Sequence, residues 1–370
     1  MKILHVVGAR PNFMKVAPVH RAIAAYPGIQ QLLVHTGQHY DLNMSDIFFQ
    51  QLGLPAPGMN LEVGSGSHAV QTAQIMMRFE ATILKEKPDL VLVYGDVNST
   101  VAAALVCAKL RIPVGHVEAG LRSFDRAMPE EINRLMTDQI ADYLFTPSRD
   151  GDQNLLREGV APGKIHFVGN VMIDTLVRLL PEAGGLWPRL SADLRLAEGG
   201  YCLVTLHRPS NVDDSAMLAR VMDTLTEISA ELPIVFPIHP RTRERLAANN
   251  IKIGENGNLQ LTDPIGYLDF LCLQQRARLV ITDSGGIQEE TTYLNVPCLT
   301  VRENTERPVT VELGTNTLVG QDMARMREET RRVLAGQAHR GEIPPLWDGQ
   351  AAERIAAVVA GLGGRSRRLI

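Results

Sequence analysis

The feature that most constrains this chain is an alternation between short apolar runs and longer segments with helical periodicity. The run 2–8 precedes a helical pattern over 14–25, and the run 90–94 precedes one over 100–110. Parallel strands need long crossover connections, usually helices, so this alternation is typical of βαβ units. The sequence therefore predicts an α/β fold with parallel sheets.

The alternation occurs in two series, separated by an irregular stretch at 181–200 that is rich in proline and glycine. In the second series, the apolar runs lie at 201–206, 234–238, 259–261, 279–282 and 298–301. The chain has 370 residues, which is more than one hydrophobic core usually serves. We therefore expect two Rossmann-like, doubly wound domains with a cleft between them.

The domain boundaries follow from these two series. We place the first domain at 1–169 and the second at 170–350, and we expect the helical segment in 351–370 to return to the first domain. Ligands of open α/β sheets bind at the carboxyl ends of the strands, near a switch in strand order. Polar residues directly after each apolar run are therefore the candidate site residues.

Composition limits the possible partners. The formal net charge of -4 does not favour nucleic-acid binding. No uncharged run reaches membrane-spanning length, and the start of the chain lacks a signal-peptide pattern. The four cysteines lie far apart without a CxxC pair, so we interpret them as reduced core residues. We expect a cytoplasmic protein that binds small molecules, without nucleic-acid or membrane partners.

A phosphate-binding pattern follows the run 279–282, where the sequence reads Asp-Ser-Gly-Gly-Ile-Gln-Glu-Glu. Gly285 and Gly286 would let a phosphate approach the backbone, and the helix start offers unpaired N–H groups beside the Ser284 hydroxyl. The alternative is a tight turn in which Ser284 only caps the helix. Glu290 could reach ribose hydroxyls or could lie on a solvated helix face.

Three cations are candidates for the same anion. Arg10 and Lys15 follow the first strand, and Arg307 lies in Asn304–Pro308. Guanidinium groups bind phosphate oxygens with two hydrogen bonds and stay charged, which suits a diphosphate. The alternatives are a solvated surface pair for Arg10 and Lys15, and a salt bridge with an acid such as Glu306 for Arg307.

Three acids come from separate strand or helix ends: Asp96, Glu118 and Glu130. If these ends converge, crowding raises one carboxyl pKa, so that one acid holds a proton while another acts as base. Each acid also has a structural alternative. Asp96 could cap the next helix, Glu118 could pair with Arg122, and Glu130 could pair with Arg134 one turn later.

His207 follows the first strand of the second series. It could act as a proton donor or contact a leaving phosphate, or it could be a hydrogen-bonded structural histidine. The motifs HExxH, GxxxxGK[ST] and GxSxG do not occur, so zinc hydrolases, P-loop proteins and serine esterases have no support.

Six segments together resemble the non-hydrolysing UDP-N-acetylglucosamine 2-epimerase family. They occur in order over nearly the whole chain, which is far more specific than any one motif. The segments are Gly8-Ala9-Arg10-Pro11, Val93–Asp96, Gly115–Arg122, Pro129–Arg134, Asp283–Glu290 and Thr305–Pro308.

The resemblance implies a GT-B-like fold, a homodimer, and interconversion of UDP-N-acetylglucosamine with UDP-N-acetylmannosamine. The implied route is anti elimination of UDP, a 2-acetamidoglucal intermediate that rotates, and re-addition of UDP, without a metal, nicotinamide or other cofactor. The catalytic positions of the family fall on Asp96, Glu118, Glu130 and His207. The substrate-binding positions, to which we add Arg134, fall on Arg10, Lys15, Ser284, Gly285, Gly286, Glu290 and Arg307.

The chain departs from the common bacterial pattern at Asn12, where a glutamate often stands, and at Ser210. Many bacterial members bind a second UDP-N-acetylglucosamine as activator through a Gln-His segment and a glutamate at the place of Ser210, so the resemblance does not predict that activation here. The segments at 36–45 and 121–124 look more like archaeal members and epimerases of UDP-2,3-diacetamido-glucuronate. The retained Thr305–Pro308 favours N-acetylglucosamine.

Other classes share this fold. A GT-B glycosyltransferase would use a similar nucleotide site, and a hydrolysing epimerase would release free N-acetylmannosamine. A catalytically silent UDP-sugar sensor is a third possibility. Incorporation of solvent deuterium at C2 of the UDP-sugar separates an epimerase of the expected kind from the transferase and from the sensor.

Overall fold

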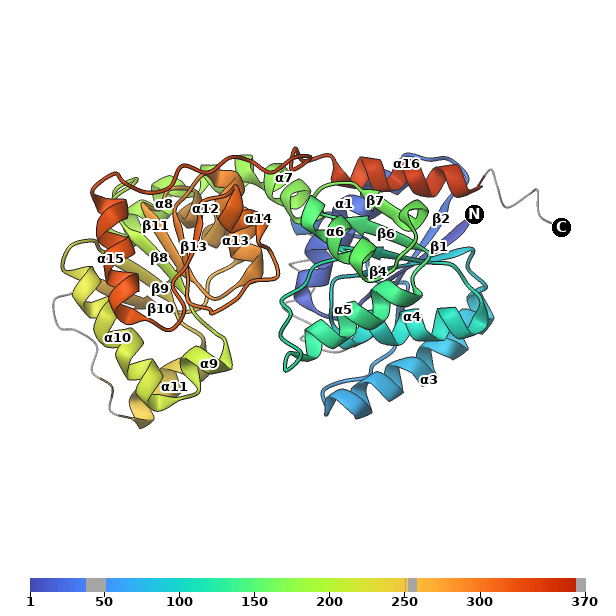
Figure 1. Ribbon diagram of the computed structural model, residues 1–370, viewed down its shortest axis with the longest axis horizontal. Helices are drawn as coiled ribbons and strands as arrows, with labels where there is room; N and C mark the ends of the chain where they lie inside the picture. Colours follow the sequence, from blue (N-terminus) through green and yellow to red (C-terminus); the bar gives the residue numbers. More distant parts are fainter. Residues whose placement is uncertain (38–50, 250, 252–257, 364–370) are drawn as a thin grey trace. The chain divides into compact units, whose positions relative to one another are not determined.

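The computed structural model describes residues 1–37, 51–249, 251 and 258–363. The chain divides into two compact units, Met1–Thr175 with Pro345–Ile370, and Leu176–Pro344. Each unit is built on one parallel sheet with helices on both faces (Figure 1). The α/β class and the doubly wound parallel sheets predicted from the sequence are confirmed.

The sheet of the first unit has seven strands in the order β3-β2-β1-β4-β5-β6-β7. The order reverses between β1 and β4, which places the topological switch point at the carboxyl ends of these two strands. The strands are β1 (Lys2–Val7), β2 (Gln30–His35), β3 (Met59–Asn60), β4 (Leu90–Tyr94), β5 (Val114–Val117), β6 (Tyr143–Thr146) and β7 (Ile165–Phe167).

The helices of the first unit cover the two faces of this sheet (Figure 1). On one face, α1 packs against α16, and on the other, α4 lies between α3 and α5. The chain leaves the unit within α7. The helices are α1 (Arg10–Ala24), α3 (His68–Glu86), α4 (Asn98–Leu110), α5 (Pro129–Ile140), α6 (Arg149–Arg157), η1 (Pro162–Lys164), α7 (Val171–Gly185) and α16 (Ala351–Gly363).

One buried carboxylate anchors the returning helix α16. The oxygens of Asp174 accept hydrogen bonds from the backbone N–H groups of Ala351 (3.1 Å) and Ala352 (2.7 Å). The first N–H groups of a helix have no partner within the helix, so this carboxylate satisfies two of them. Burial raises the pKa of Asp174 to about 6, even though both N–H groups favour its ionised form.

The sheet of the second unit has six strands in the order β10-β9-β8-β11-β12-β13. Its order reverses between β8 and β11, so its switch point lies at the ends of those strands. The strands are β8 (Cys202–Thr205), β9 (Ile234–Pro237), β10 (Leu259–Thr262), β11 (Leu279–Thr282), β12 (Cys298–Thr300) and β13 (Asn316–Leu318).

Eight helices of the described part of the second unit surround this sheet: α8 (Trp187–Leu194), α9 (Pro209–Val212), α10 (Ser215–Ser229), α11 (Pro240–Ala248), α12 (Tyr267–Gln275), α13 (Gly285–Leu294), α14 (Val309–Glu312) and α15 (Met323–Leu334). None of the described helices in either unit is both long and apolar enough to cross a bilayer. All four cysteines are buried and form no disulfide.

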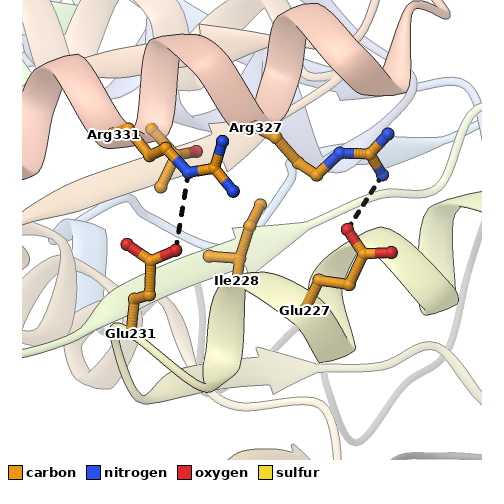
Figure 2. A pocket seen from close by; sticks show the side chains of 6 residues that line it. Glu227, Ile228, Glu231, Arg327 and Arg331 are labelled. Carbon is orange, nitrogen blue, oxygen red and sulfur yellow. Dashed lines mark ion pairs between the residues drawn. The ribbon is translucent and has the colours of Figure 1, made fainter.

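A small pocket between α10 and α15 is crossed by two ion pairs (Figure 2). Arg327 lies 3.1 Å from Glu227, and Arg331 lies 3.5 Å from Glu231. Because three of these four side chains are more than half exposed, each pair stabilises the fold by less than about 1 kcal/mol. The cavity volume of about 20 Å³ has room for about one water molecule, so we assign no ligand to it.

Candidate active site

Asn12 holds together the two strand ends at the switch point of the first unit. Its Oδ1 accepts the N–H groups of Gly8 and Ala9, both at 3.1 Å. Its Nδ2 donates to the backbone oxygen of Tyr94 at the end of β4, at 2.8 Å. The residue that departs from the bacterial pattern therefore fixes the turn between β1 and α1, a role that the sequence did not indicate.

Lys15 and Glu118 form a shielded ion pair beside the end of β4. The Lys15 Nζ lies 2.8 Å from Glu118 Oε1, and the two side chains are only 8% and 3% exposed. Gly95 makes room for the lysine, because a Cβ on this glycine would lie 2.6 Å from Nζ. Glu118 itself has φ +74°, a strained conformation that typically costs about 1–3 kcal/mol and clusters at functional sites.

Two residues of α5 contact Asp96. Arg134 pairs with the Asp96 carboxylate through Nη1 and with Glu131 through Nη2 (2.7 Å). Asn133 donates to the Asp96 backbone oxygen at 2.8 Å. Burial favours the neutral form of Glu131, but the Ser123 N–H and the Arg134 guanidinium outweigh it and lower its pKa. Asp96 does not begin α4, because the residue at that N-cap is Val97.

Glu130 lies in the first turn of α5 and is partly exposed. Its local alternative, a pair with Arg134, is not formed, because Arg134 contacts Asp96 and Glu131. Of the three candidate acids, Asp96 and Glu118 each have a cationic partner, whereas Glu130 has no ion pair with any residue that the structure describes.

At the switch point of the second unit, a buried aspartate orients an exposed histidine. Asp283 follows β11, and its Oδ1 lies 2.8 Å from the Nδ1 of His207, which follows β8. Asp283 also accepts hydrogen bonds from the Arg208 N–H (2.9 Å) and the Asn211 amide (3.0 Å). Burial alone would raise the pKa of Asp283, but hydrogen bonds led by the one from His207 lower it.

The His207 side chain is 59% exposed although its ring is anchored. The contact with Asp283 occupies Nδ1, and Nε2 makes no hydrogen bond within the described part of the chain. A carboxylate on one ring nitrogen fixes the orientation of a histidine whose other nitrogen acts on a ligand. This geometry favours the functional interpretation of His207 over the structural one.

The start of α13 has the features of an anion site. Ser284 occupies the N-cap, but its side chain makes no capping hydrogen bond. Gly285 packs closely against Arg307, because a Cβ on this glycine would lie 2.5 Å from Nη1. Gly286 follows within the first turn, where the backbone N–H groups lack partners within the helix. The alternative in which Ser284 serves only as a cap is not supported.

Arg307 and Glu290 lie in the buried interior behind this helix start. Arg307 forms the salt bridge with Glu306 that the sequence offered as an alternative (2.6 Å), and its Nε lies 2.8 Å from Glu289. Glu290 accepts the Tyr267 hydroxyl at 2.8 Å. Burial, together with the nearby Glu289 charge, raises the pKa of Glu290 to about 7. Glu290 does not lie on a solvated helix face.

Some predicted residues lie wholly or partly outside the described part of the structure. Arg10 begins α1, but its side chain is not described. The segments Gln38–Asp41 and Asn43–Ser45 lie outside the described residues. In the described ranges, no group of three or more His, Cys, Asp or Glu side chains is arranged to hold a metal ion.

Comparison with known proteins gives consistent matches. The family model described as UDP-N-acetylglucosamine 2-epimerase matches residues 21–360. The UDP-N-acetylglucosamine 2-epimerase of Methanocaldococcus jannaschii is 44% identical over 364 residues, covering 97% of this chain and 99% of that protein. The UDP-2,3-diacetamido-2,3-dideoxy-D-glucuronate 2-epimerase of Pseudomonas aeruginosa is 43% identical over 366 residues, covering 98% and 100%.

A solved structure also resembles the whole chain. The crystal structure of the M. jannaschii UDP-GlcNAc 2-epimerase in complex with UDP-GlcNAc and UDP matches with a TM-score of 0.88 and 43% identity. The match covers 98% of this chain and 100% of that one. The similarity therefore extends over both units.

Proposed function

This chain belongs to the UDP-N-acetylglucosamine 2-epimerase family, and we propose that it interconverts UDP-N-acetylglucosamine and UDP-N-acetylmannosamine. The observation that carries the proposal is the group of acids at the ends of β4, β5 and the start of α5, two of which are held by cations. The proposed route is anti elimination of UDP to a 2-acetamidoglucal, rotation of this intermediate, return of a proton to the opposite face of C2, and re-addition of UDP at C1 with its original configuration.

The chemistry explains why such acids are needed. The hydrogen on C2 is weakly acidic, so its removal requires a positioned base and stabilisation of the departing diphosphate. Asp96 and Glu118 are already engaged by Arg134 and Lys15. We assign the C2 proton transfer to Glu130, because its carboxylate has no ion pair among the described residues. Asp96, Glu118 and their cations orient the sugar and balance charge around it.

The second unit supplies the proposed contacts to UDP. Ser284, Gly285 and Gly286 at the start of α13 would bind the diphosphate through backbone N–H groups and the serine hydroxyl. His207, oriented by Asp283, would donate to the leaving diphosphate oxygen. The remaining binding candidates, which complete the substrate contacts of the proposal, are Arg10, Lys15, Arg134, Glu290 and Arg307.

Proton NMR of UDP-N-acetylglucosamine with the purified protein in deuterium oxide tests this function. We expect UDP-N-acetylmannosamine to appear and deuterium to enter C2 of both epimers. Free N-acetylmannosamine with UDP would identify a hydrolysing enzyme instead. Consumption of the substrate only on addition of an acceptor, without C2 deuterium, would contradict the proposal and favour a glycosyltransferase.

A second substrate has its own support, because the P. aeruginosa relative named for UDP-2,3-diacetamido-2,3-dideoxy-D-glucuronate is about as similar as the archaeal one. The Thr305–Pro308 segment favours the plain N-acetylglucosamine substrate. Measuring kcat/KM for both UDP-sugars side by side separates them. We expect at least about tenfold preference for UDP-N-acetylglucosamine, which corresponds to about 1.4 kcal/mol in the transition state.

We also propose a cytoplasmic homodimer. Three exposed apolar side chains recur at seven-residue intervals along α3, namely Val70, Met77 and Leu84. That interval places them on one helical face, which suits packing against the same face of a second copy. Met77→Glu should shift the protein from dimer to monomer in sedimentation, whereas Leu156→Glu, at an exposed site on α6, should not. A monomeric parent protein would contradict the dimer.

A further inference from the structure

A cluster of charged side chains lies buried behind the catalytic candidates of the first unit and has no role in the function proposed above. It consists of His116 on β5, Asp138 on α5, Arg122, and Glu158 at the end of α6. His116, Asp138 and Arg122 are each at most 2% exposed. Burying charges costs several kcal/mol unless they are paired and hydrogen-bonded, so the geometry of this cluster is tightly constrained.

Asp138 is the centre of the cluster. Its Oδ1 lies 2.6 Å from His116 Nδ1, and its Oδ2 lies 2.7 Å from Arg122 Nη1. Oδ2 also accepts the backbone N–H of Gly120 at 3.0 Å. Burial would raise the pKa of Asp138, but the contacts with His116 and Arg122 outweigh it and lower that pKa. Asp138 therefore serves as an ionised acceptor with both oxygens engaged.

His116 links this carboxylate to the end of the neighbouring strand. Its Nε2 lies 2.8 Å from the backbone oxygen of Gly95, the residue that precedes Asp96. The ring therefore bridges the Asp138 carboxylate and the Gly95 backbone oxygen. Through one imidazole, the Asp138 carboxylate fixes the backbone that carries Asp96.

The same carboxylate fixes the backbone around Glu118. His116 precedes Glu118 by two residues, and Gly120, which also donates to Asp138, follows it by two. The Glu118 N–H donates to the Phe145 backbone oxygen at 3.1 Å. The strained φ of +74° at Glu118 persists only if its surroundings over-determine it, and these flanking contacts do so.

We propose that Asp138, acting through His116, is a positioning residue that sets the placement of Asp96 relative to Glu118. The inference rests on the proposed epimerase function, because it takes these two acids to contact the sugar. Asp138 and His116 touch neither substrate nor reacting atoms in this account. A displacement of about 1 Å of a catalytic group lowers a rate by about 100-fold, which sets the expected scale.

Asp138→Asn tests the proposal, because asparagine keeps the size of the side chain but has only one acceptor oxygen and no charge. We expect kcat for UDP-N-acetylglucosamine to fall about 100-fold while KM changes by less than about threefold. The matched control is Asp142→Asn. The Asp142 carboxylate accepts the Val114 N–H at 3.0 Å at the opposite end of β5, so kcat should stay within about twofold of the parent value.

His116→Asn provides a second variant that removes the Gly95 contact and leaves the Asp138–Arg122 pair in place. We expect it to lower kcat by a similar factor, and we expect the double variant to be no slower than Asp138→Asn alone. Such non-additivity is the signature of residues that act as one unit. If Asp138→Asn does not fold, as judged by circular dichroism, His116→Asn carries the test.

The outcomes separate the two proposals. Epimerisation by the parent protein tests the proposed function by itself, and only the ratio of each variant to the parent tests the positioning role. A folded Asp138→Asn or His116→Asn variant that keeps kcat within about twofold overturns the positioning role. A loss of kcat in Asp142→Asn as large as that in Asp138→Asn overturns it too, because any damage to β5 would then suffice.

Discussion

The two units have corresponding strand orders around the switch point, but different kinds of side chains follow the strands there. In each sheet the strand order reverses at a central pair of neighbouring strands. This pair is β1 and β4 in the first unit, and the corresponding pair is β8 and β11 in the second. In the first unit, carboxylates with cationic partners follow the strands. In the second, an exposed histidine and a glycine-rich helix start follow them. Strand order provides the place for a ligand, and the residues after each strand decide its chemistry.

The units also differ in how far their candidate residues are shielded. The Lys15–Glu118 pair is nearly excluded from solvent, whereas the His207 ring is 59% exposed. Charges interact more strongly where water is excluded, so a change to the pair should disturb both folding and catalysis. A change around His207 should affect catalysis more than folding. The following substitutions test this difference.

Glu118→Gln should have the largest effect. It leaves the buried Lys15 ammonium without its charged partner, so the free energy of unfolding should fall by about 3–5 kcal/mol. Because Glu118 also contacts the sugar in our account, kcat should fall at least about 1000-fold. Urea titration and turnover measurements check both. The double variant Lys15→Met/Glu118→Gln should regain stability but not activity, and regained activity would contradict the proposed role.

Asp283→Asn should have the next largest effect on turnover. It loosens the His207 ring, so kcat should fall about 100-fold while the affinity for UDP changes little. The folded-state pKa of Asp283 is lowered, so its ionised carboxylate stabilises the fold at pH values above 3.8, the ordinary pKa of an aspartate. This stabilisation is lost as pH falls through the folded-state pKa. The stability difference between parent and variant should therefore shrink below pH 4 in urea titrations. A constant difference would contradict this linkage.

Gly285→Ala should have a smaller effect, confined to nucleotide binding. The added methyl would lie 2.5 Å from Arg307 Nη1 and 2.9 Å from Glu306 Oε1, so these buried side chains or the start of α13 must shift. We expect the affinity for UDP, measured by calorimetry, to fall about tenfold. Gly266→Ala at the start of α12 is the matched control, because its methyl would meet nothing within 4 Å. Equal losses in both variants would argue against a specific anion site.

Glu290→Gln should have the smallest effect on turnover, and its main effect should be on stability. Burial raises the pKa of Glu290 from 4.5 to about 7, so the folded state holds its proton more tightly than the unfolded state. Parent stability should therefore fall by roughly 3 kcal/mol as pH rises from 4.5 to 7. The variant should lack this decline in urea titrations at pH 5 and pH 8. An identical decline in both proteins would show that Glu290 is not its source.

Most of the described strands could be predicted because they form short, mainly apolar runs, but β2, β3 and β13 could not. The strand β2 begins with two glutamines, a polar start that does not indicate a strand. In the structure, Gln31 is satisfied by His5 Nε2 (2.9 Å) and by the His20 backbone oxygen (3.1 Å). Such tertiary partners make a polar residue compatible with a strand, and no local pattern shows them.

The sequence identified the candidate site residues but not how they pair in the structure. Asp96, Glu118 and the Ser-Gly-Gly turn could be found because they follow apolar runs, and Glu130 because it lies at a helix start. The partner of Glu118 could not, since Lys15 lies 103 residues away and the nearer Arg122 pairs with Asp138 and Glu158. A spacing of four residues does not predict this ion pair, because a buried charge pairs with whichever opposite charge the fold brings closest. No sequence pattern indicated a positioning role for Asp138. The one available hint was that its partner His116 lies two residues before Glu118.

The proposed function assigns exchange of the C2 proton to an acid of the first unit and binding of UDP to the second unit. It is tested most directly by comparing C2 deuterium exchange with UDP affinity in Glu130→Gln. The account predicts that exchange falls at least about 1000-fold while the Kd for UDP, measured by calorimetry, stays within about threefold of the parent value. Exchange at the parent rate, or loss of UDP binding together with exchange, would contradict the assignment of Glu130 as the proton-transfer residue.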